Sequence, residues 1–576
     1  MKKIFLSIIV LGSLYSCNLE REPYDGAITD KVVVTEAGLG QYLNGIYSKL
    51  GIGSTSYLGN SVILNLYRNG TFGSDEIHMS SASSDDMTQF YTYLRNATGA
   101  RMNAAWNDGL SSVFATNTIF ENMQEGKSQE LDHMLGEAYY LRAFANYAML
   151  MSYSFPYSYG RENKGIILKT TTNPDDRPLR STVGESYDAV VRDLLKAEKL
   201  MSGDSKNGIK ATQAAAQALL SRVYLYMEQD AKALEYAEKV INNGRYTLVT
   251  KDQLPTYAQS VPELNTETIF AFRFENRPNQ YAGGSMLGSM YAVISNEGWG
   301  EMYATDSYIQ QLNKFPEDAR NKFITRDLPR DDKGKEIKNP IVYWTFFNSS
   351  TNRYEYQTYT ANVDIAGNYV SWNEPEKDSK GNIVLDANKK PVIKAVYPIL
   401  SETVDYGGTT YVRKYSNYNG GKQYLTCDLE LTTRGGFPKF YINKLSYQEK
   451  VGHLYSPVVS RLAEMYLIRA EVKAKAGNVA GALADINIIR KRAGAPEFSS
   501  LPAGKTALDM VLEERWLEFA FEGHRKFDLL RNKRPIVRQF PGISLSKFTI
   551  QPSDPEIISF VPQREINLQP GLQQND

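Results

Sequence analysis

Cysteine and histidine are scarce in this chain of 576 residues, which contains two cysteines and four histidines. One pair of cysteines cannot provide a disulfide framework, so the fold has to depend on its hydrophobic core. The histidines, at positions 78, 133, 453 and 524, are widely scattered. A lone histidine without further ligands at a suitable spacing does not form a zinc site. We therefore expect no metal site and no cofactor.

Net charge is also missing, because 65 basic residues balance 65 acidic ones. This balance argues against a nucleic-acid surface or an anionic-membrane patch as the main function of the fold. The Gly-x-Ser-x-Gly, phosphate-loop, Cys-x-x-Cys and His-Glu-x-x-His signatures are absent. We expect a protein that is not an enzyme. A glycoside hydrolase stays open as an alternative, because it needs only two carboxylates about 5 to 10 Å apart.

Long apolar runs are absent outside the N-terminus, where residues 4–14 follow Lys2 and Lys3. The run is too short to span a bilayer and is typical of a signal peptide, which we place at residues 1–16. A soluble body is expected beyond it.

Cys17 directly follows this segment and a small residue, in the sequence LYSC, and so resembles the lipidated cysteine of a bacterial lipobox. Tyr15 is bulkier than that position usually holds, which leaves an ordinary secreted protein as the alternative. With Cys17 acylated, lipid would be the only membrane contact of the body, and Cys427 would have no disulfide partner.

Helices are predicted in pairs, because apolar residues recur at spacings of three and four. Small residues on these stripes, such as Ala138, Ala145 and Ala215, let a neighbouring helix approach closely. The pattern predicts a mostly α, tetratricopeptide-like scaffold of stacked helix pairs with insertions. The expected helices cover residues 135–151, 211–227, 230–244, 458–477 and 478–494.

The helical period is lost between residues 251 and 455, where Gly, Asn, Thr and Tyr become frequent. Strand-like runs at 340–347 and 391–400, and Asp-x-x-Gly turns within 331–337 and 378–384, predict a loop- and hairpin-rich insert. A Ca²⁺ loop on Asp378, Asn382 and Asp386 is an alternative that lacks a closing glutamate. The expected organisation is a helical part at 17–250, this insert at 251–455 and a second helical part at 456–576.

The most charged segment is EERWLEFAFEGHRKFDLLR, residues 513–531. Glu514, Glu518 and Glu522 are four residues apart, so we expect them on one helix face with Arg515, Arg525 and Arg531 as partners. Gly523 is expected to end the helix, and Asp528 to cap the next segment or pair with an arginine. We interpret the segment as a charge lattice that supports the fold and not as an active site.

Four C-terminal segments and three N-terminal ones together resemble the SusD/RagB family, the nutrient-binding surface lipoproteins of Bacteroidetes. The resemblance covers essentially the whole mature chain and weakens between about residues 270 and 440. The segments are 137–150, 211–227, 242–248, 461–471, 485–494, 513–531 and 560–576.

This resemblance implies a SusD-like fold, no catalysis, and a glycan-binding lipoprotein on the outer face of the outer membrane. It also implies a partner, a SusC-type TonB-dependent transporter that receives the captured oligosaccharide. Some members of the family serve peptide importers, so a peptide ligand is an alternative, and a pure assembly scaffold is another. The 39 tyrosines and five tryptophans favour a sugar.

Two tryptophans of the insert are the predicted ligand contacts. Trp299 is flanked by glycines that leave its ring uncrowded and its backbone mobile, and Trp372 has Tyr369 and Asn373 beside it. Each ring is either a stacking platform for a sugar or buried against the hairpins of the insert. Trp344, in an apolar run, is expected to be core.

The N-terminal half is expected to add contacts from its loop region. The resemblance implies that family members also bind ligand there. The residues concerned are Arg68, Asp75, Phe90 and Tyr91.

Overall fold

The computed structural model describes residues 35–53, 59–201, 203, 206–278, 281, 283–543, 545 and 547–576. The predicted signal peptide and Cys17 lie outside the described residues. In the part of the chain that is described, no helix combines the length and the apolar character needed to cross a membrane.

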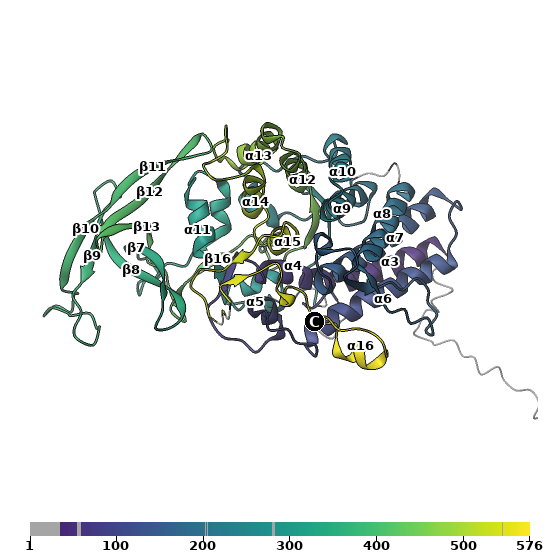
Figure 1. Cartoon of the computed structure of the whole chain (residues 1–576), viewed down its shortest axis with the longest axis horizontal. Coiled ribbons are helices and arrows are strands. Elements are labelled where there is room, and N and C mark those ends of the chain that lie inside the picture. Colours follow the sequence, from purple (N-terminus) through teal and green to yellow (C-terminus); the bar gives the residue numbers. More distant parts are fainter. Residues whose placement is uncertain are drawn as a thin grey trace, which may run out of the picture.

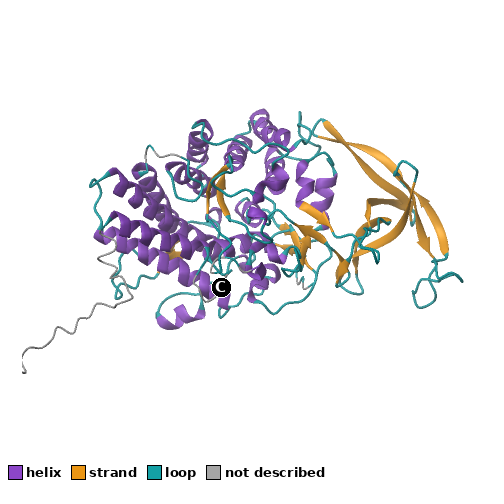
Figure 2. Cartoon of the chain, turned by 180° about the vertical axis from the view of Figure 1, so that it is seen from behind, coloured by secondary structure: helices purple, strands orange, loops and turns teal. Residues whose placement is uncertain are grey.

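A body of stacked helices forms one end of the molecule, and a curled antiparallel sheet forms the other (Figures 1 and 2). The helices of the body are α3 (Glu36–Gly51), α4 (Val62–Phe72), α5 (Gln89–Thr92), α6 (Ala100–Asn122), α7 (Gln129–Tyr153), α8 (Val183–Leu200), α9 (Gln213–Tyr226), α10 (Asp230–Asn242), α11 (Asp306–Asn313), α12 (Leu462–Lys475), α13 (Val479–Ala493), α14 (Ala507–Glu518), α15 (Arg525–Arg531) and α16 (Gln563–Leu568).

The predicted helix pairs are confirmed, since α9 packs on α10 and α12 on α13, and α6 packs on α7 in the same way. Ala138, Ala145 and Ala215 are fully buried, which is how neighbouring helices approach closely. The pairs join into one row because α10 also packs on α12, although these helices are more than 200 residues apart in sequence. One hydrophobic cluster therefore runs through both helical parts, and a second packs α12, α13 and α14 together.

The expected helix at 458–477 starts four residues late. Val458–Arg461 form strand β17 instead, which pairs with β4 (Thr268–Ala271). Consecutive β-branched residues at 458 and 459 favour a strand, and pairing with β4 satisfies the backbone there.

Seven strands form the sheet, in the order β10, β9, β8, β7, β13, β12, β11, and every neighbouring pair is antiparallel. They are β7 (Pro340–Asn348), β8 (Arg353–Val363), β9 (Tyr369–Pro375), β10 (Ile393–Pro398), β11 (Leu400–Tyr406), β12 (Thr409–Tyr418) and β13 (Gly421–Leu429).

The two edges of this sheet are consecutive in sequence. Only Ile399 separates β10 from β11, and one residue spans about 3.5 Å, so the two edge strands are joined at one end and the sheet curls there. The first and last residues of the module are neighbours as well, because Pro340 pairs with Leu429. The curled sheet thus leaves the body and returns to it at one place.

Smaller two-stranded ladders position the loops of the body. They pair β1 (Ile77–Met79) with β5 (Met302–Ala304), β2 (Lys164–Ile167) with β3 (Arg180–Thr182), β6 (Ile324–Arg326) with β16 (Phe440–Ile442), β14 (Thr433–Arg434) with β15 (Phe437–Pro438), and β18 (Ile536–Val537) with β19 (Thr549–Ile550).

The predicted hairpin turns are confirmed at both Asp-x-x-Gly sites. Arg330 bridges to Glu336, and Lys377 bridges to Ile383. Oδ1 of Asp378 accepts hydrogen bonds from the backbone N–H groups of Lys380 and Asn382 at 2.9 Å each. The carboxylate proposed for a Ca²⁺ loop therefore caps its own turn.

Candidate functional site

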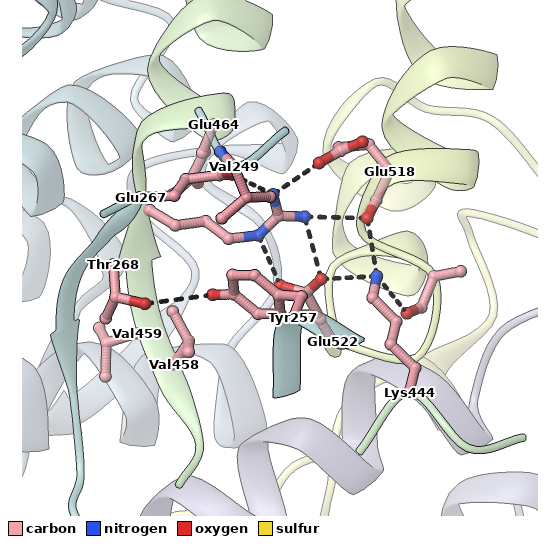
Figure 3. A network of polar contacts seen from close by, with 12 residues as sticks. Val249, Tyr257, Glu267, Thr268, Lys444, Val458, Val459, Glu464, Glu518 and Glu522 are labelled. Carbon is pink, nitrogen blue, oxygen red and sulfur yellow. Dashed lines mark hydrogen bonds and ion pairs between the residues drawn. The ribbon is translucent and has the colours of Figure 1, made fainter. Parts of the chain in front are cut away.

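The charged segment 513–531 forms a buried ion-pair lattice. Glu514 accepts from Arg320 at 2.7 Å, and Glu518 accepts from Arg461 at 2.6 Å. Glu522 binds Lys444 at 2.6 Å. The guanidinium of Arg461 is the common partner of Glu267, Glu518 and Glu522 (Figure 3). Glu514, Glu518 and Glu522 are each at most 5 % exposed. The interpretation as a fold-supporting lattice therefore fits its geometry.

The predicted partners within the segment were wrong. The cations that bind the three glutamates come from η6 (Ala319–Phe323), β17 and α13 and from Lys444. The three arginines of the segment bind other carboxylates, since Arg515 pairs with Asp528, Arg525 with Asp75, and Arg531 with Glu471. Asp528 thus pairs with an arginine as expected.

Gly523 does not end the helix as predicted. Helix α14 stops at Glu518, and Gly523 lies in the turn before α15 with a φ of +79°. A Cβ atom on Gly70 would lie 1.9 Å from the carbonyl oxygen of Gly523. Glycine at these positions allows helix α4 to touch this turn, a contact between segments that the local sequence does not reveal.

The lattice offers little scope for acid–base chemistry. Burial alone would raise the pKa of Glu518, but the charges of Arg492 and Arg461 outweigh it and hold the pKa far below its usual range. Desolvation and nearby cations lower the pKa of His524. The cavity beside Glu522 and His524 measures only about 30 Å³, close to the volume of one water.

Trp299 and Arg68 are brought together in a larger pocket of about 400 Å³. The pocket lies where the loop after β1 meets the segment before β5, and the β1–β5 ladder holds the two side by side. Its lining residues are Arg68, Ala82, Ser83, Ser84, Asp85, Met87, Arg101, Gly284, Ser285, Ser289, Met290, Trp299 and Glu301.

The indole of Trp299 is 57 % exposed but firmly held. Its Nε1–H donates to the carbonyl of Gly284 at 2.9 Å, and its backbone N–H donates to Ser289 at 2.7 Å. The flanking glycines have φ values of +92° and +51°, and a Cβ on Gly298 would lie 2.6 Å from the carbonyl of Ala292. The expectation of a mobile backbone was wrong, because these glycines permit a tight, fixed turn.

Two arginines form the polar side of the pocket. Arg101 binds both oxygens of Asp85 at 2.6 Å, whereas Arg68 donates to the backbone carbonyls of Gly59 and Ser285. Burial, together with the charge of Arg101, lowers the pKa of Arg68 to about 10. Burial also disfavours the ionised form of Asp85, but hydrogen bonds from Arg101 and from the N–H of Met87 outweigh it and lower the pKa of this carboxyl.

The other residues predicted from the N-terminal half lie in the interior. Asp75 is 7 % exposed and gives both carboxylate oxygens to Arg525 at 2.8 and 2.9 Å. Phe90 and Tyr91 belong to α5 and are core residues, and the guanidinium of Arg538 lies 4.3 Å from the ring centre of Tyr91. Because they are buried, the expectation that these three side chains contact a ligand directly was wrong.

Trp372 is fully buried in the curled sheet, so its prediction as a stacking platform is corrected. Tyr359 and Tyr397 stack against the ring with centroid distances of 4.5 Å each, and Nε1 donates to Ser416 at 3.0 Å. The flanking strands β8 and β10 cover the two ring faces, and the curl brings Tyr418 of β12 against the edge of the ring. Trp344 packs beside it and is core, as predicted.

Tyr369 and Asn373 also have partners within the sheet. The hydroxyl of Tyr369 donates to the carbonyl of Asp428 at 2.7 Å, and Asn373 exchanges hydrogen bonds with Asn362 at 2.9 and 3.3 Å. Neither lines the pocket of Trp299. Among the described residues, no cluster of three or more His, Cys, Asp and Glu side chains could hold a metal ion.

Sequence reasoning missed Arg101, Glu301 and the carbonyls of Gly284 and Ser285. Arg101 depends on Asp85, a loop residue 16 positions earlier, and carbonyl groups leave no signal in a sequence. Glu301 was detectable, since it lies two residues from Trp299.

Comparison with known proteins gives consistent matches. A model of the SusD family matches residues 266–576, and a second model, described as starch-binding and associating with the outer membrane, matches residues 19–225. The curated SusD-like protein P2 of Formosa agariphila is 22 % identical over 558 residues, which cover 92 % of this chain and 91 % of that protein.

Solved structures share the fold. A SusD superfamily protein of Bacteroides thetaiotaomicron is 21 % identical, with a TM-score of 0.68 and coverage of 94 % of this chain and 100 % of that one. A laminarin-binding SusD-like protein is 18 % identical, with a TM-score of 0.55 and coverage of 93 % and 98 %. The predicted fold class, mostly helical with a strand-rich insert, is confirmed.

Proposed function

The chain belongs to the SusD family, and on this premise we propose that it is a cell-surface lipoprotein that captures oligosaccharides and delivers them to an outer-membrane transporter. The transporter would be of the SusC type and TonB-dependent, as the family resemblance implies. Lipidated Cys17 would tether the body to the outer membrane, facing the exterior. Association with the outer membrane agrees with the description of the family that matches residues 19–225.

The observation that carries this proposal is the exposed, fixed indole of Trp299 at a polar pocket. A flat aromatic ring can pack on the C–H face of a sugar, while neighbouring polar groups bind its hydroxyls. Ser83, Asp85 and Glu301 offer acceptors and Arg101 offers donors around the ring, while the buried Arg68 holds the carbonyls of Gly59 and Ser285 in place. Because the ring is already anchored, little side-chain entropy is lost on binding.

Binding fits this pocket better than catalysis. Its two carboxylates are both held in ion pairs, Asp85 by Arg101 and Glu301 by Arg434. Asp85 in particular has a lowered pKa and so stays ionised, which is unsuitable for a general acid. A glycoside hydrolase would need one carboxyl group that stays protonated near neutral pH.

Calorimetry with a panel of oligosaccharides tests the proposal. Trp299→Ala should weaken binding of the cognate oligosaccharide by about 1 to 3 kcal/mol, typical of an aromatic hot spot, without changing the melting temperature. Phe114→Ala is a matched control, because Phe114 is 46 % exposed on α6 and does not line the pocket. Equal affinities in both variants and the parent, or binding of peptides alone, would contradict the proposal.

A further inference from the structure

A second pocket, of about 430 Å³, lies between helix α11 and the curled sheet. It shares no residue with the pocket of Trp299. Its lining residues are Gln310, Asn313, Lys314, Pro316, Trp344, Tyr411, Val412, Arg413, Lys414, Tyr424, Leu425, Thr426 and Cys427.

The pocket exists because the sheet splits at this point. Residues 426–429 of β13 pair with β7, with Thr426 opposite Tyr343. Residues 421–425 pair instead with β12, with Leu425 opposite Lys414. Trp344, the next residue of β7, therefore has no partner on β13. The strands diverge here, and α11 with the following Lys314 and Pro316 closes the opening on one side.

Positive charge dominates this pocket. Three cations line it, Lys314, Arg413 and Lys414, and no carboxylate does. Arg413 is fixed by Glu402 at 2.6 Å and by the ring of Tyr424, whose centre lies 3.7 Å from the guanidinium carbon. A cation held in place in this way is already positioned for an incoming anion.

The oxygen partners of the two lysines are neutral, and Nζ of Lys314 also lies 4.3 Å from the ring centre of Tyr406. Nζ of Lys414 donates to the hydroxyl of Ser401 at 2.9 Å, and Nζ of Lys314 donates to the amide oxygen of Gln311 at 2.6 Å. Among the described residues, neither lysine has a carboxylate within 4 Å. An anion entering the pocket would find two cations without an ion-pair partner, and it would gain charge-assisted hydrogen bonds.

The remaining lining groups suit a saccharide. Tyr411 and Tyr424 supply aromatic surface, and Gln310 and Asn313 supply amide donors and acceptors for hydroxyl groups. The volume accommodates roughly one to two sugar rings, since pockets for small ligands begin near 300 Å³.

We propose that this pocket binds the carboxylate or sulfate group of an acidic oligosaccharide, as a second binding site on the same chain. The inference rests on the proposed function only for the identity of the ligand as a saccharide. The positive charge of the pocket would then make the protein select uronate-bearing or sulfated chains over neutral ones.

The test is calorimetry on the purified protein with three probes: a uronate pentasaccharide, a sulfated pentasaccharide and a neutral one. Lys414→Met and Lys314→Met should each weaken binding of at least one acidic probe by about 10-fold, the effect of losing one charged hydrogen bond. Affinity for the neutral probe should not change, and added salt should weaken acidic binding. Lys338→Met, an exposed lysine outside the pocket, is the matched control.

The results separate this inference from the proposed function. Acidic binding that weakens in the lysine variants but not in Trp299→Ala would support the second pocket, whereas binding of the neutral probe that is unchanged in Trp299→Ala would contradict the first. Equal affinity of the parent protein for all three probes, or acidic binding that survives in both lysine variants, would overturn the inference. Melting temperatures of each variant identify any loss that comes from unfolding.

Discussion

Arg461 and Glu522 form a two-point ion pair, in which Nε and Nη2 of the guanidinium donate to the two carboxylate oxygens at 2.9 Å each. The same guanidinium also binds Glu267 and Glu518 at 2.6 Å each. One arginine at the end of β17 thus connects the strand before α12 to the turn after α14. The family's charged segment therefore joins elements of the core.

Glu522→Ala should lower the free energy of unfolding by about 3 to 5 kcal/mol, because it leaves Arg461 and Lys444 buried without a shared partner. Urea denaturation measures the change. Glu336→Ala breaks an exposed pair with Arg330 and should cost at most about 1 kcal/mol. Folded Glu522→Ala protein should bind ligand normally, and lost binding at an unchanged melting temperature would indicate a binding site instead.

Trp372→Ala should also act on stability and not on recognition. Removing a fully buried ring from between Tyr359 and Tyr397 leaves a cavity, which costs about 3 to 5 kcal/mol. Thermal unfolding gives the loss, and calorimetry on the folded variant should give the parental affinity for a neutral oligosaccharide. A variant that melts like the parent but binds more weakly would restore Trp372 as a ligand contact.

Asp306→Asn should stabilise the protein at neutral pH. Burial raises the pKa of Asp306 from 3.8 to about 6, despite hydrogen bonds, including one of 2.7 Å from Gln310. The folded protein therefore holds this proton more tightly than the unfolded chain does, and stability from this group is lost as pH rises from about 4 to 6. The amide cannot titrate, so the free energy of unfolding of the variant should rise by about 3 kcal/mol relative to that of the parent over that interval.

Urea denaturation of parent and variant at pH 4, 5, 6 and 7 measures this difference. Both proteins share the titration of all other groups, so only the difference between them reports on Asp306. A difference that is constant over this pH range would show that the carboxyl titrates normally in the folded protein.

Cys17→Ala should release the protein from membranes, because lipid is the proposed sole anchor. Fractionation of cells that lack the partner transporter measures the distribution, and the parent protein should stay with the outer membrane. Retention of the variant in the membrane fraction would contradict lipidation at this residue.

The helical body could be predicted from sequence because its signals are local. Within each helical segment, small residues fall at helical spacing, as around Ala138 in one helix and Ala215 in another, and each helix packs mainly on its neighbours. For the ion-pair lattice, its existence could be predicted from sequence but its individual pairs could not. Glu514 finds Arg320, which lies 194 residues away, and no local pattern encodes such a pair.

The candidate site could be anticipated from local signals only. Trp299, which stays a predicted contact, could be singled out because its flanking glycines are visible in the sequence, although their role is to permit positive φ values. Trp372 was misplaced because the curl of the sheet depends on the connection at Ile399, which joins two edges that look like separate hairpins in sequence. Burial of a tryptophan in a sheet depends on how the whole sheet closes.

The pairing of Pro340 with Leu429 has an evolutionary consequence. Since the curled sheet begins and ends at adjacent backbone positions, one recombination event can replace residues 340–429 without moving either end of the body. A lineage could thus exchange this cassette, together with the basic pocket that it helps to form, while inheriting the helical scaffold and its ion-pair lattice intact.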